Sequence, residues 1–470
     1  GISGLSCAWL LSRNAEVVLY ETEARPGGHS NTVIAPGGER GTPVDTGFIV
    51  YNDRNYPNLV KLFEHLDVPT LPSDMSFAAS LGDGAFEYSG SGLSGLLGQK
   101  SNLLRPRFWR MVKDILRFYR EAPALLERPD LDGVSLGDYL ASAGYANSFI
   151  EDHLLPMGAA IWSTTASEMR LYPLHAFIRF FANHGLLTLT DRPRWRTVKG
   201  GSREYVARIL ADFRGTIRLS TPVAHVRRSA AGVEIVDVHG QAETYDDVVL
   251  ATHANQSLDL LEDADQRERA LLEAFQYTPN LAVLHSDEAL MPKRKSVWSS
   301  WNYVAGRRDG AAGEVLCVTY WMNKLQSLDP ANPLFVTLNP CRPIDPAKVI
   351  QTFNYEHPLF DAAAIRAQRQ IWQLQGHRNT WYCGAYFGSG FHEDGLQAGL
   401  AVAEALGGGD HFAAHIPAGP GHRLAAGRCF QCAILSFQRS LRFAVGELHA
   451  GARDDAALQR TDIDGGTRLD

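Results

Sequence analysis

Helical and strand-like patterns of hydrophobic and polar positions alternate from the start of the chain. Leu5–Leu11 is an apolar run compatible with a helix, and Glu16–Glu21 is a β-branched run ending on an acid, which is typical of a strand. Later strand patterns at Gly232–Val238 and Thr244–Ala251 are expected to pair in parallel, and Tyr56–Leu66 has a helical pattern. The mixture predicts an α/β fold.

Two glycines flank the start of the first helix. If one more glycine preceded them, Gly1 and Gly4 would complete a GxGxxG dinucleotide fingerprint, with Glu21 lying 20 residues beyond Gly1. Gly1, Ser3 and Gly4 would then meet a pyrophosphate at the helix N-terminus, and Glu21 would accept the ribose hydroxyls. The alternative is an ordinary glycine turn. Because the chain begins inside this motif, we expect the natural N-terminus to lie further upstream.

A second glycine pair follows the first strand, in Arg25-Pro26-Gly27-Gly28-His29. This segment resembles the one after the second strand in the flavin amine oxidase, phytoene desaturase and protoporphyrinogen oxidase superfamily. The resemblance implies FAD as cofactor, with Arg25, Gly27 and Gly28 along its pyrophosphate and flavin. His29 stands where many members carry a basic residue.

The stretch Asp45–Val50 resembles the superfamily segment beside the isoalloxazine ring. There Gly47 would allow close backbone approach and Phe48 would lie next to the cofactor. The alternative is a strand with a bulge glycine. By the same resemblance, the backbone of Val223 would contact the adenine, and the alternative for that segment is an edge strand.

A further strand, glycine loop and helix lie near the end of the patterned region. Residues 384–399 resemble the C-terminal flavin motif of the superfamily, leading into a helix expected at Leu400–Leu406. The resemblance assigns Gly384 to the cofactor, and the N–H groups of Gly395 and Leu396 are expected at a phosphate. Asp394 is either a cofactor contact or a helix cap. Ala385 stands where many members have an acid.

Composition excludes several classes of protein. The chain has 470 residues, 45% of them hydrophobic, and a net charge of −7 that gives no basic field for nucleic acid. Six scattered cysteines indicate reduced thiols in a cytoplasmic protein, and we expect no metal site at the Cys429/Cys432 pair. No apolar run reaches the length of a membrane span.

The residues 105–126 form a basic amphipathic pattern. Arg110, Lys113, Arg117 and Arg120 share one helical face, opposite a face expected to hold Phe108, Met111, Val112, Ile115, Leu116 and Tyr119. Such a helix either covers a core or makes peripheral contact with an anionic membrane. Aromatic residues crowd 162–181 and 298–321, which favours an apolar substrate cavity.

These segments predict a Rossmann-like FAD-binding domain built from discontinuous segments, 1–50, 196–262 and 376–409. An α+β substrate domain with a helical insertion would comprise 51–195 and 263–375, and 410–470 would be an atypical appendage. The stretches Pro156–Ser163 and Gly384–Gly395 resemble a bacterial NAD/FAD-binding, amine-oxidase-like branch. That branch is also similar to the flavin-like region of plant cyclopropane fatty acid synthases, which implies a lipid setting.

Three functions fit these patterns. The first is an oxidoreductase that oxidises or desaturates an apolar, lipid-like small molecule by hydride transfer to FAD. The second is a flavin amine oxidase, and the third is a non-catalytic FAD-binding partner protein. No motif fixes a catalytic residue; Lys199 and Lys324 are candidates only by analogy with amine oxidases, and surface positions are their alternative.

Overall fold

The computed structural model describes residues 1–470 apart from 190–191, 308–313, 316 and 409–470. The expected appendage and the Cys429/Cys432 pair therefore lie outside the described residues. Two parallel strand pairs form the first layer, β1 (Val18–Tyr20) with β9 (Thr216–Arg218) and β13 (Val248–Leu250) with β21 (Thr380–Tyr382). The helix and strand predicted at the start of the chain are confirmed as α1 (Ile2–Leu11) and β1.

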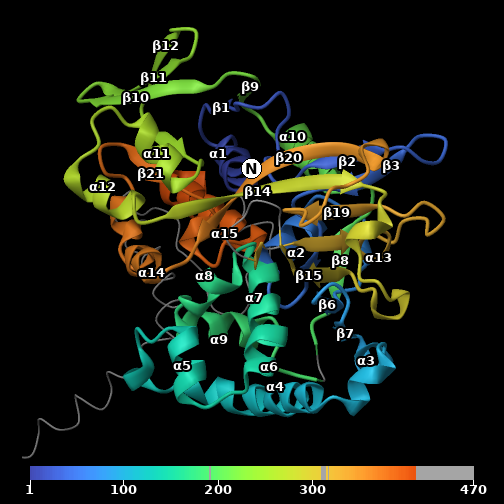
Figure 1. The fold of residues 1–470 in the computed structure, drawn as a ribbon. Helices are drawn as coiled ribbons and strands as arrows, with labels where there is room; N and C mark the ends of the chain where they lie inside the picture. Colours follow the sequence, from blue (N-terminus) through green and yellow to red (C-terminus); the bar gives the residue numbers. More distant parts are fainter. Residues whose placement is uncertain (190–191, 308–313, 316, 409–470) are drawn as a thin grey trace, which may run out of the picture.

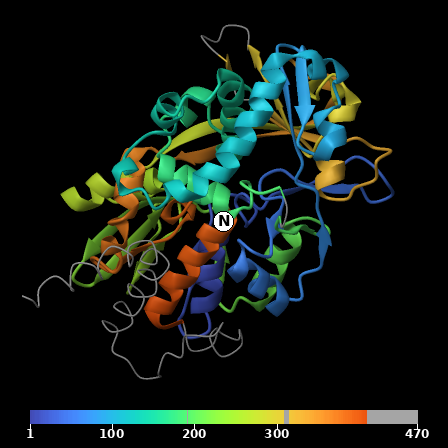
Figure 2. The ribbon, with the colours of Figure 1, turned by 90° about the horizontal axis from the view of Figure 1, so that it is seen from below.

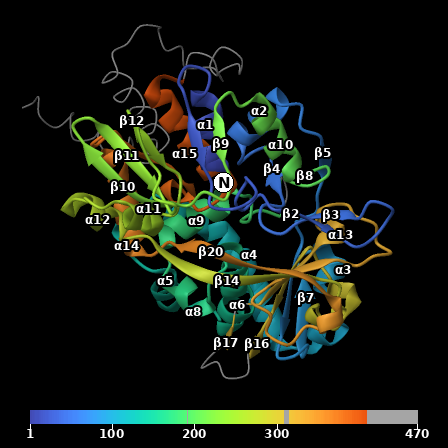
Figure 3. The same cartoon turned by 90° about the horizontal axis from the view of Figure 1, so that it is seen from above.

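Helices cover these strand pairs. α1 packs against α15 (His392–Ala403), and the two helices lie side by side in Figures 2 and 3. Their shared core includes Leu5, Trp9 and Leu396, and it extends to α2 (Pro57–His65) and α10 (Arg203–Asp212). Apolar burial of this kind contributes about 25 cal/mol per Å², so the core holds the N-terminus of α1 in place.

A three-stranded antiparallel sheet lies beside the strand pairs. It comprises β10 (Val223–Ser229), β11 (Gly232–Asp237) and β12 (Ala242–Tyr245). The expected parallel pairing of 232–238 with 244–251 is wrong, because the second segment splits: its start belongs to β12, and its end forms β13, which pairs with β21. A short turn at 238–241 joins β11 to β12 as antiparallel neighbours.

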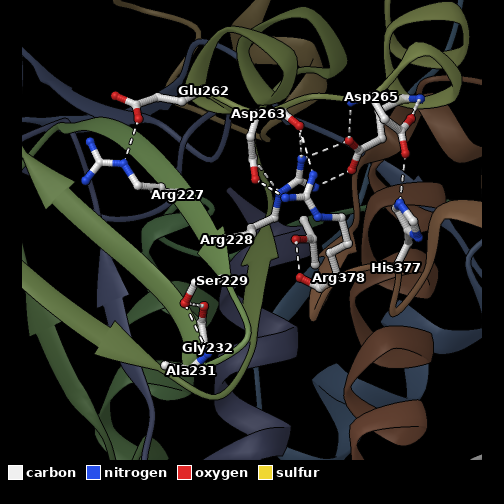
Figure 4. Close-up of polar contacts among 12 residues, drawn as sticks. Arg227, Arg228, Ser229, Ala231, Gly232, Glu262, Asp263, Asp265, His377 and Arg378 are labelled. Atoms are coloured by element: carbon white, nitrogen blue, oxygen red, sulfur yellow. Dashed lines mark hydrogen bonds and ion pairs between the residues drawn. The ribbon is translucent and has the colours of Figure 1, made fainter.

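Ion pairs attach this small sheet to the neighbouring helix α12 (Gln266–Leu272) (Figure 4). The guanidinium of Arg228 donates to Asp263 at 2.8 Å and to both carboxylate oxygens of Glu268, and the Arg228 and Glu268 side chains are buried. Burial alone would raise the pKa of Glu268, but the hydrogen bonds from Arg228 and the Asp265 N–H outweigh it and lower the pKa.

The largest sheet has seven strands in the order β20-β14-β19-β18-β15-β6-β7. All neighbours are antiparallel except β15 and β6. The strands are β6 (Phe77–Leu81), β7 (Phe86–Ser89), β14 (Gln276–His285), β15 (Trp301–Val304), β18 (Val318–Trp321), β19 (Phe335–Leu338) and β20 (Val349–Leu359). The mixed α/β architecture confirms the predicted fold class.

A block of helices packs below this sheet in Figure 1. It contains α3 (Gly92–Leu96), α4 (Pro106–Leu125), α5 (Leu136–Ser142), α6 (Asn147–Phe149), the π-helical turn η3 (Ile150–Leu154), α7 (Leu155–Trp162), α8 (Ala166–Arg170) and α9 (Leu174–Asn183). The predicted α4 helix is confirmed, with Phe108 and Met111 buried. Leu116 was expected on the buried face but is 49% exposed, because it lies on the strip that carries Lys113 and Arg120.

Shorter elements connect these layers. A hairpin joins β2 (Thr32–Ala35) to β3 (Thr42–Asp45), and β8 (Trp195–Val198) pairs with β4 (Tyr51–Asn52) and β5 (Thr70–Pro72). The remaining α-helices and strands are α11 (Ala254–Leu260), α13 (Met322–Leu325), α14 (Ala362–Gln368), β16 (Gly306–Arg307) and β17 (Glu314–Val315). No helix among the described residues is long and apolar enough to cross a membrane.

Candidate functional site

One large cavity of about 1700 Å³ connects the strand pairs to the helical block. The N-terminus of α1, the ends of β1 and β13 and the loop after β21 line one end, and residues of α7, α9, β15 and β20 line the other. Of the residues predicted to bind the cofactor, all line this cavity except Arg25, Asp394 and Leu396. Sequence segments far apart thus meet at one site.

The end of the cavity at α1 has the features of an anion site. Gly1, Ser3 and Gly4 line it at the helix N-terminus, where no side chain caps the free N–H groups. A Cβ on Gly1 would point into open space, whereas a Cβ on Gly4 would lie 3.0 Å from Ala251 Cβ. Glu21 follows β1 on the same wall. Gly1 therefore leaves room for a ligand, and Gly4 allows helix and strand to pack closely.

The second glycine pair contacts the first. Gly27 and Gly28 have φ angles of +118° and +57°, and a Cβ on Gly28 would lie 2.9 Å from Gly1 Cα. Arg25 stays outside the cavity and donates to the carbonyl oxygens of Gly28 at 2.9 Å and Ser30 at 3.4 Å. Its guanidinium shapes the glycine turn.

His29 and the 45–50 segment form the middle of the cavity. A Cβ on Gly47 would lie 2.2 Å from the His29 carbonyl oxygen, which accepts a hydrogen bond from the Phe48 N–H at 2.8 Å. The Phe48 ring stacks on His392 with centroids 3.8 Å apart. Burial lowers the pKa of His29 well below its usual range, and its Nε2 has no hydrogen-bond partner among the described residues.

The C-terminal segment differs from its prediction in one respect. Gly384 and Gly395 line the cavity, but α15 begins at His392, eight residues before the predicted start at Leu400. The Gly395 N–H consequently donates to the Phe391 carbonyl at 3.1 Å, so the expectation that it is free for a phosphate is wrong.

The other members of this segment have structural partners. Leu396 is fully buried against the α1 core. Asp394 accepts from the N–H groups of Ser389 at 3.0 Å and Phe391 at 2.8 Å, as a helix cap does. Burial raises its pKa to about 6. Val223, at the start of β10, does line the cavity.

The opposite end of the cavity is aromatic and was only broadly predicted. Its lining residues come from α4, α7, α9, strands of the seven-stranded sheet and the loops between them. They carry mostly apolar side chains: Met75, Phe77, Tyr88, Tyr119, Met157, Ile161, Trp162, Phe180, Leu186, Trp301, Tyr320, Leu338, Tyr355, Phe360 and Phe391. Histidines 153, 184 and 357 also line it, and burial lowers the pKa of each to about 4. No local motif in the sequence marks these histidines.

Charged groups are unevenly distributed over the cavity. The lining acids flank β1 or lie in the segment from β12 to α11, apart from Glu356, which contacts His253 at 3.2 Å. No lysine is among the described lining residues: Lys199 is exposed, and Lys324 pairs with Asp74 at 3.3 Å. Within the described part of the chain, no group of His, Cys, Asp and Glu could hold a metal ion.

An extended cavity with a glycine-lined helix N-terminus at one end and an apolar chamber at the other suits a FAD-dependent oxidoreductase. A family model described as flavin containing amine oxidoreductase matches residues 2–328. The chain belongs to this family, which confirms the predicted superfamily, the enzyme class and FAD as cofactor. A non-catalytic role is thereby set aside. A search of curated proteins found no match.

Solved structures share the fold at low sequence identity. Putrescine oxidase bound to putrescine has a TM-score of 0.61 at 13% identity, covering 86% of this chain and 97% of that one. The fatty acid isomerase from P. acnes that produces CLA has a TM-score of 0.60 at 14% identity, covering 85% and 95%. Cyclohexylamine oxidase from Brevibacterium oxydans has a TM-score of 0.60 at 15% identity, covering 86% and 97%.

Proposed function

We propose that this enzyme oxidises or desaturates an apolar, lipid-like substrate. The observation that carries the proposal is the aromatic end of the cavity, where the described lining residues are mostly apolar and include no lysine, and where the carboxylate of Glu356 already contacts His253 Nδ1 at 3.2 Å. A buried ammonium group without a carboxylate partner is costly, so an amine substrate fits this chamber less well than a neutral one.

FAD, when bound, accepts a hydride from the substrate. We propose that Gly1, Ser3, Gly4, Gly27 and Gly28 hold its pyrophosphate, because they gather at one helix N-terminus with open space in front of them. The segments 1–50, 196–262 and 376–408 would then form the cofactor domain. The aromatic walls orient the substrate and exclude water from it.

The chemistry is tested by anaerobic reduction. FAD-loaded protein is mixed with saturated acyl lipids, with apolar alcohols and with alkyl amines, and the oxidised flavin absorption band is followed. We expect bleaching by a lipid or alcohol and none by the amines. Bleaching by the amines alone would refute the proposal and favour amine oxidation, as in the putrescine and cyclohexylamine oxidases.

We also propose that the enzyme meets a membrane through a surface formed by Leu103 and Leu104, just before α4, and by the outer face of α4, comprising Trp109, Lys113, Leu116 and Arg120. Leu104 is 88% and Trp109 50% exposed. Trp109, Lys113, Leu116 and Arg120 are spaced four, three and four residues apart, which places them on one strip of the helix. Exposed apolar side chains beside cations suit an anionic bilayer.

Vesicle sedimentation tests this contact. The FAD-loaded protein is expected to sediment with phosphatidylglycerol vesicles more than with phosphatidylcholine vesicles. The double variant Leu104→Ser, Trp109→Ser should lose that binding, while Leu171→Ser, at a 69% exposed leucine outside the face, should keep it. Equal binding of all three proteins would refute the proposed membrane contact.

A further inference from the structure

An arginine lies beside the end of α9, at the aromatic end of the cavity. The helix ends at Asn183, and Gly185 follows in the left-handed conformation, with φ +64°. The Leu186 N–H turns back to donate to the Phe181 carbonyl at 2.8 Å. The chain then returns past this turn, and Arg192 Cα lies 3.8 Å from the position that a Cβ on Gly185 would take. The turn thus places Arg192 against the end of the helix.

The fold uses one nitrogen of the Arg192 guanidinium. Nε donates to the Thr188 carbonyl at 3.1 Å, whereas the two terminal nitrogens have neither an ion pair nor a hydrogen bond with any described residue. Arg192 is exposed and lines the cavity, so a ligand can reach it. The guanidinium is therefore held by Nε and keeps its terminal N–H groups available to an anion.

The guanidinium also lies near a ring of the chamber wall. Tyr119 comes from α4 and lines the cavity. Burial raises the pKa of Tyr119, and the positive charge of Arg192 opposes this rise. Because such an effect requires the two groups to be close, the charge of Arg192 acts on the chamber and not only on the outer surface.

A row of stacked rings leads from the end of α9 toward the middle of the cavity. His184 stacks on Phe180 with centroids 3.8 Å apart, and Phe180 stacks on Phe391 at 4.7 Å. The next residue, His392, stacks on Phe48 at 3.8 Å. All of these residues line the cavity, and Phe48 belongs to the segment expected beside the flavin. An apolar chain can therefore lie along an aromatic surface from α9 toward that segment.

Arg192 has no cationic competitor at this end among the described lining residues. The other arginine that lines the cavity, Arg218, lies on β9 and pairs with Glu243 at 2.8 Å. Burial lowers the pKa of each of the three chamber histidines to about 4, so they are neutral near pH 7. The aromatic end thus carries a single permanent positive charge. A planar guanidinium recognises a carboxylate through two parallel hydrogen bonds.

We propose that the Arg192 guanidinium binds the carboxylate of the substrate, which makes the substrate a fatty acid whose chain lies along the row of rings. An alcohol or an ester gains no ion pair at Arg192, and an ammonium is repelled. A phosphate monoester would bring a charge of about −1.5 to −2 to a single cation, so a carboxylate is the better match. The inference rests on the proposed function, since it names the apolar, lipid-like substrate of that same chamber.

Calorimetric titration tests the site without turnover. The protein is the full chain with bound FAD that has been reduced anaerobically, so that it accepts no hydride. The probes are octanoate, methyl octanoate, octanol, octylamine and octyl phosphate, which share a chain and differ in their head group. We expect octanoate to bind roughly tenfold tighter than methyl octanoate, the size of one charge-assisted hydrogen bond, and to lose most of this advantage in about 1 M NaCl.

Three results would overturn the proposal. They are equal affinity of octanoate and methyl octanoate, an octanoate preference that salt leaves unchanged, and tighter binding of octylamine or octyl phosphate than of octanoate. The salt dependence tests the ion pair in the natural protein, without any variant.

Variants then assign the preference to the guanidinium. Arg192→Gln should reduce the octanoate-to-ester ratio of affinities to about one, and Arg192→Lys, which keeps the charge without the planar fork, should restore part of it. Arg194→Gln removes a nearby exposed arginine that does not line the cavity, and it should leave the ratio unchanged. A ratio that survives in Arg192→Gln, or that falls equally in Arg194→Gln, refutes the assignment.

The design separates this inference from the proposed function. Flavin absorbance and thermal melting first establish that each variant is folded and holds FAD. If the octanoate preference depends on Arg192 but no acyl lipid or alcohol bleaches the flavin, the carboxylate site stands and the proposed reaction fails. If acyl lipids or alcohols bleach the flavin without an Arg192-dependent preference, the reaction stands and the carboxylate site fails.

Discussion

Substitution of Gly399 by alanine should weaken FAD binding although this residue does not line the cavity. Gly395 and Gly399 are four residues apart on α15 and face α1. A Cβ on Gly399 would lie 2.2 Å from the Ser3 carbonyl oxygen and 2.5 Å from Ser6 Oγ. Ser3 belongs to the first turn of α1, which we propose holds the pyrophosphate.

Two opposing effects decide the outcome of Gly399→Ala. Alanine in a helix interior gains about 0.5–1 kcal/mol over glycine. The new methyl group would be more than about 1 Å too close to a carbonyl that is fixed within α1, and overpacking of this kind costs about 1–3 kcal/mol. We expect a net loss of roughly 1 kcal/mol and a displaced α1 N-terminus, and a loss of this size in FAD binding would raise the dissociation constant about fivefold.

Flavin titration and urea unfolding measure the two effects. Gln397→Ala, at an exposed position of the same helix, serves as the control and should leave both FAD affinity and stability nearly unchanged. If Gly399→Ala were more stable than the natural protein and bound FAD equally well, α1 and α15 would not be packed as described here.

Two further predictions concern stability. Arg228→Met leaves the buried Glu268 carboxylate without its guanidinium partner and should lower the free energy of unfolding in urea by about 3–5 kcal/mol. The neighbouring Arg227→Met removes a half-exposed ion pair and should cost less than about 1 kcal/mol. Equal costs would contradict a buried pair of Arg228 and Glu268. Burial lowers the pKa of His285 from 6.5 to about 4. Below pH 6.5 the unfolded chain therefore binds a proton at this histidine that the folded chain does not bind. This difference removes roughly 3 kcal/mol of the free energy of unfolding by pH 4. In urea unfolding at pH 7 and about pH 4.5, His285→Gln should lose less stability on acidification than the natural protein, and an unchanged acid dependence would contradict this.

The meeting of the glycines at the α1 end of the cavity could be predicted because its determinants are local. Gly1 and Gly4 lie at the start of α1, Glu21 follows β1, and Gly27 and Gly28 come a few residues later, so their spacing along the chain already implies their meeting. The start of α15 could not be predicted in the same way. Gly395 and Gly399 suggest a loop in the sequence. In the structure they lie within the helix, where a Cβ on either residue would come too close to Ser3 or Ser6 of α1.

The substrate end depends on contacts between distant segments. Aromatic clusters in the sequence indicated an apolar chamber but gave no means of ordering its walls. Tyr88 and His153 are 65 residues apart in the sequence. They meet because the helical turn η3 packs against the seven-stranded sheet. The exposure of Leu116 on α4 was missed although it lies on the same helical strip as Lys113 and Arg120.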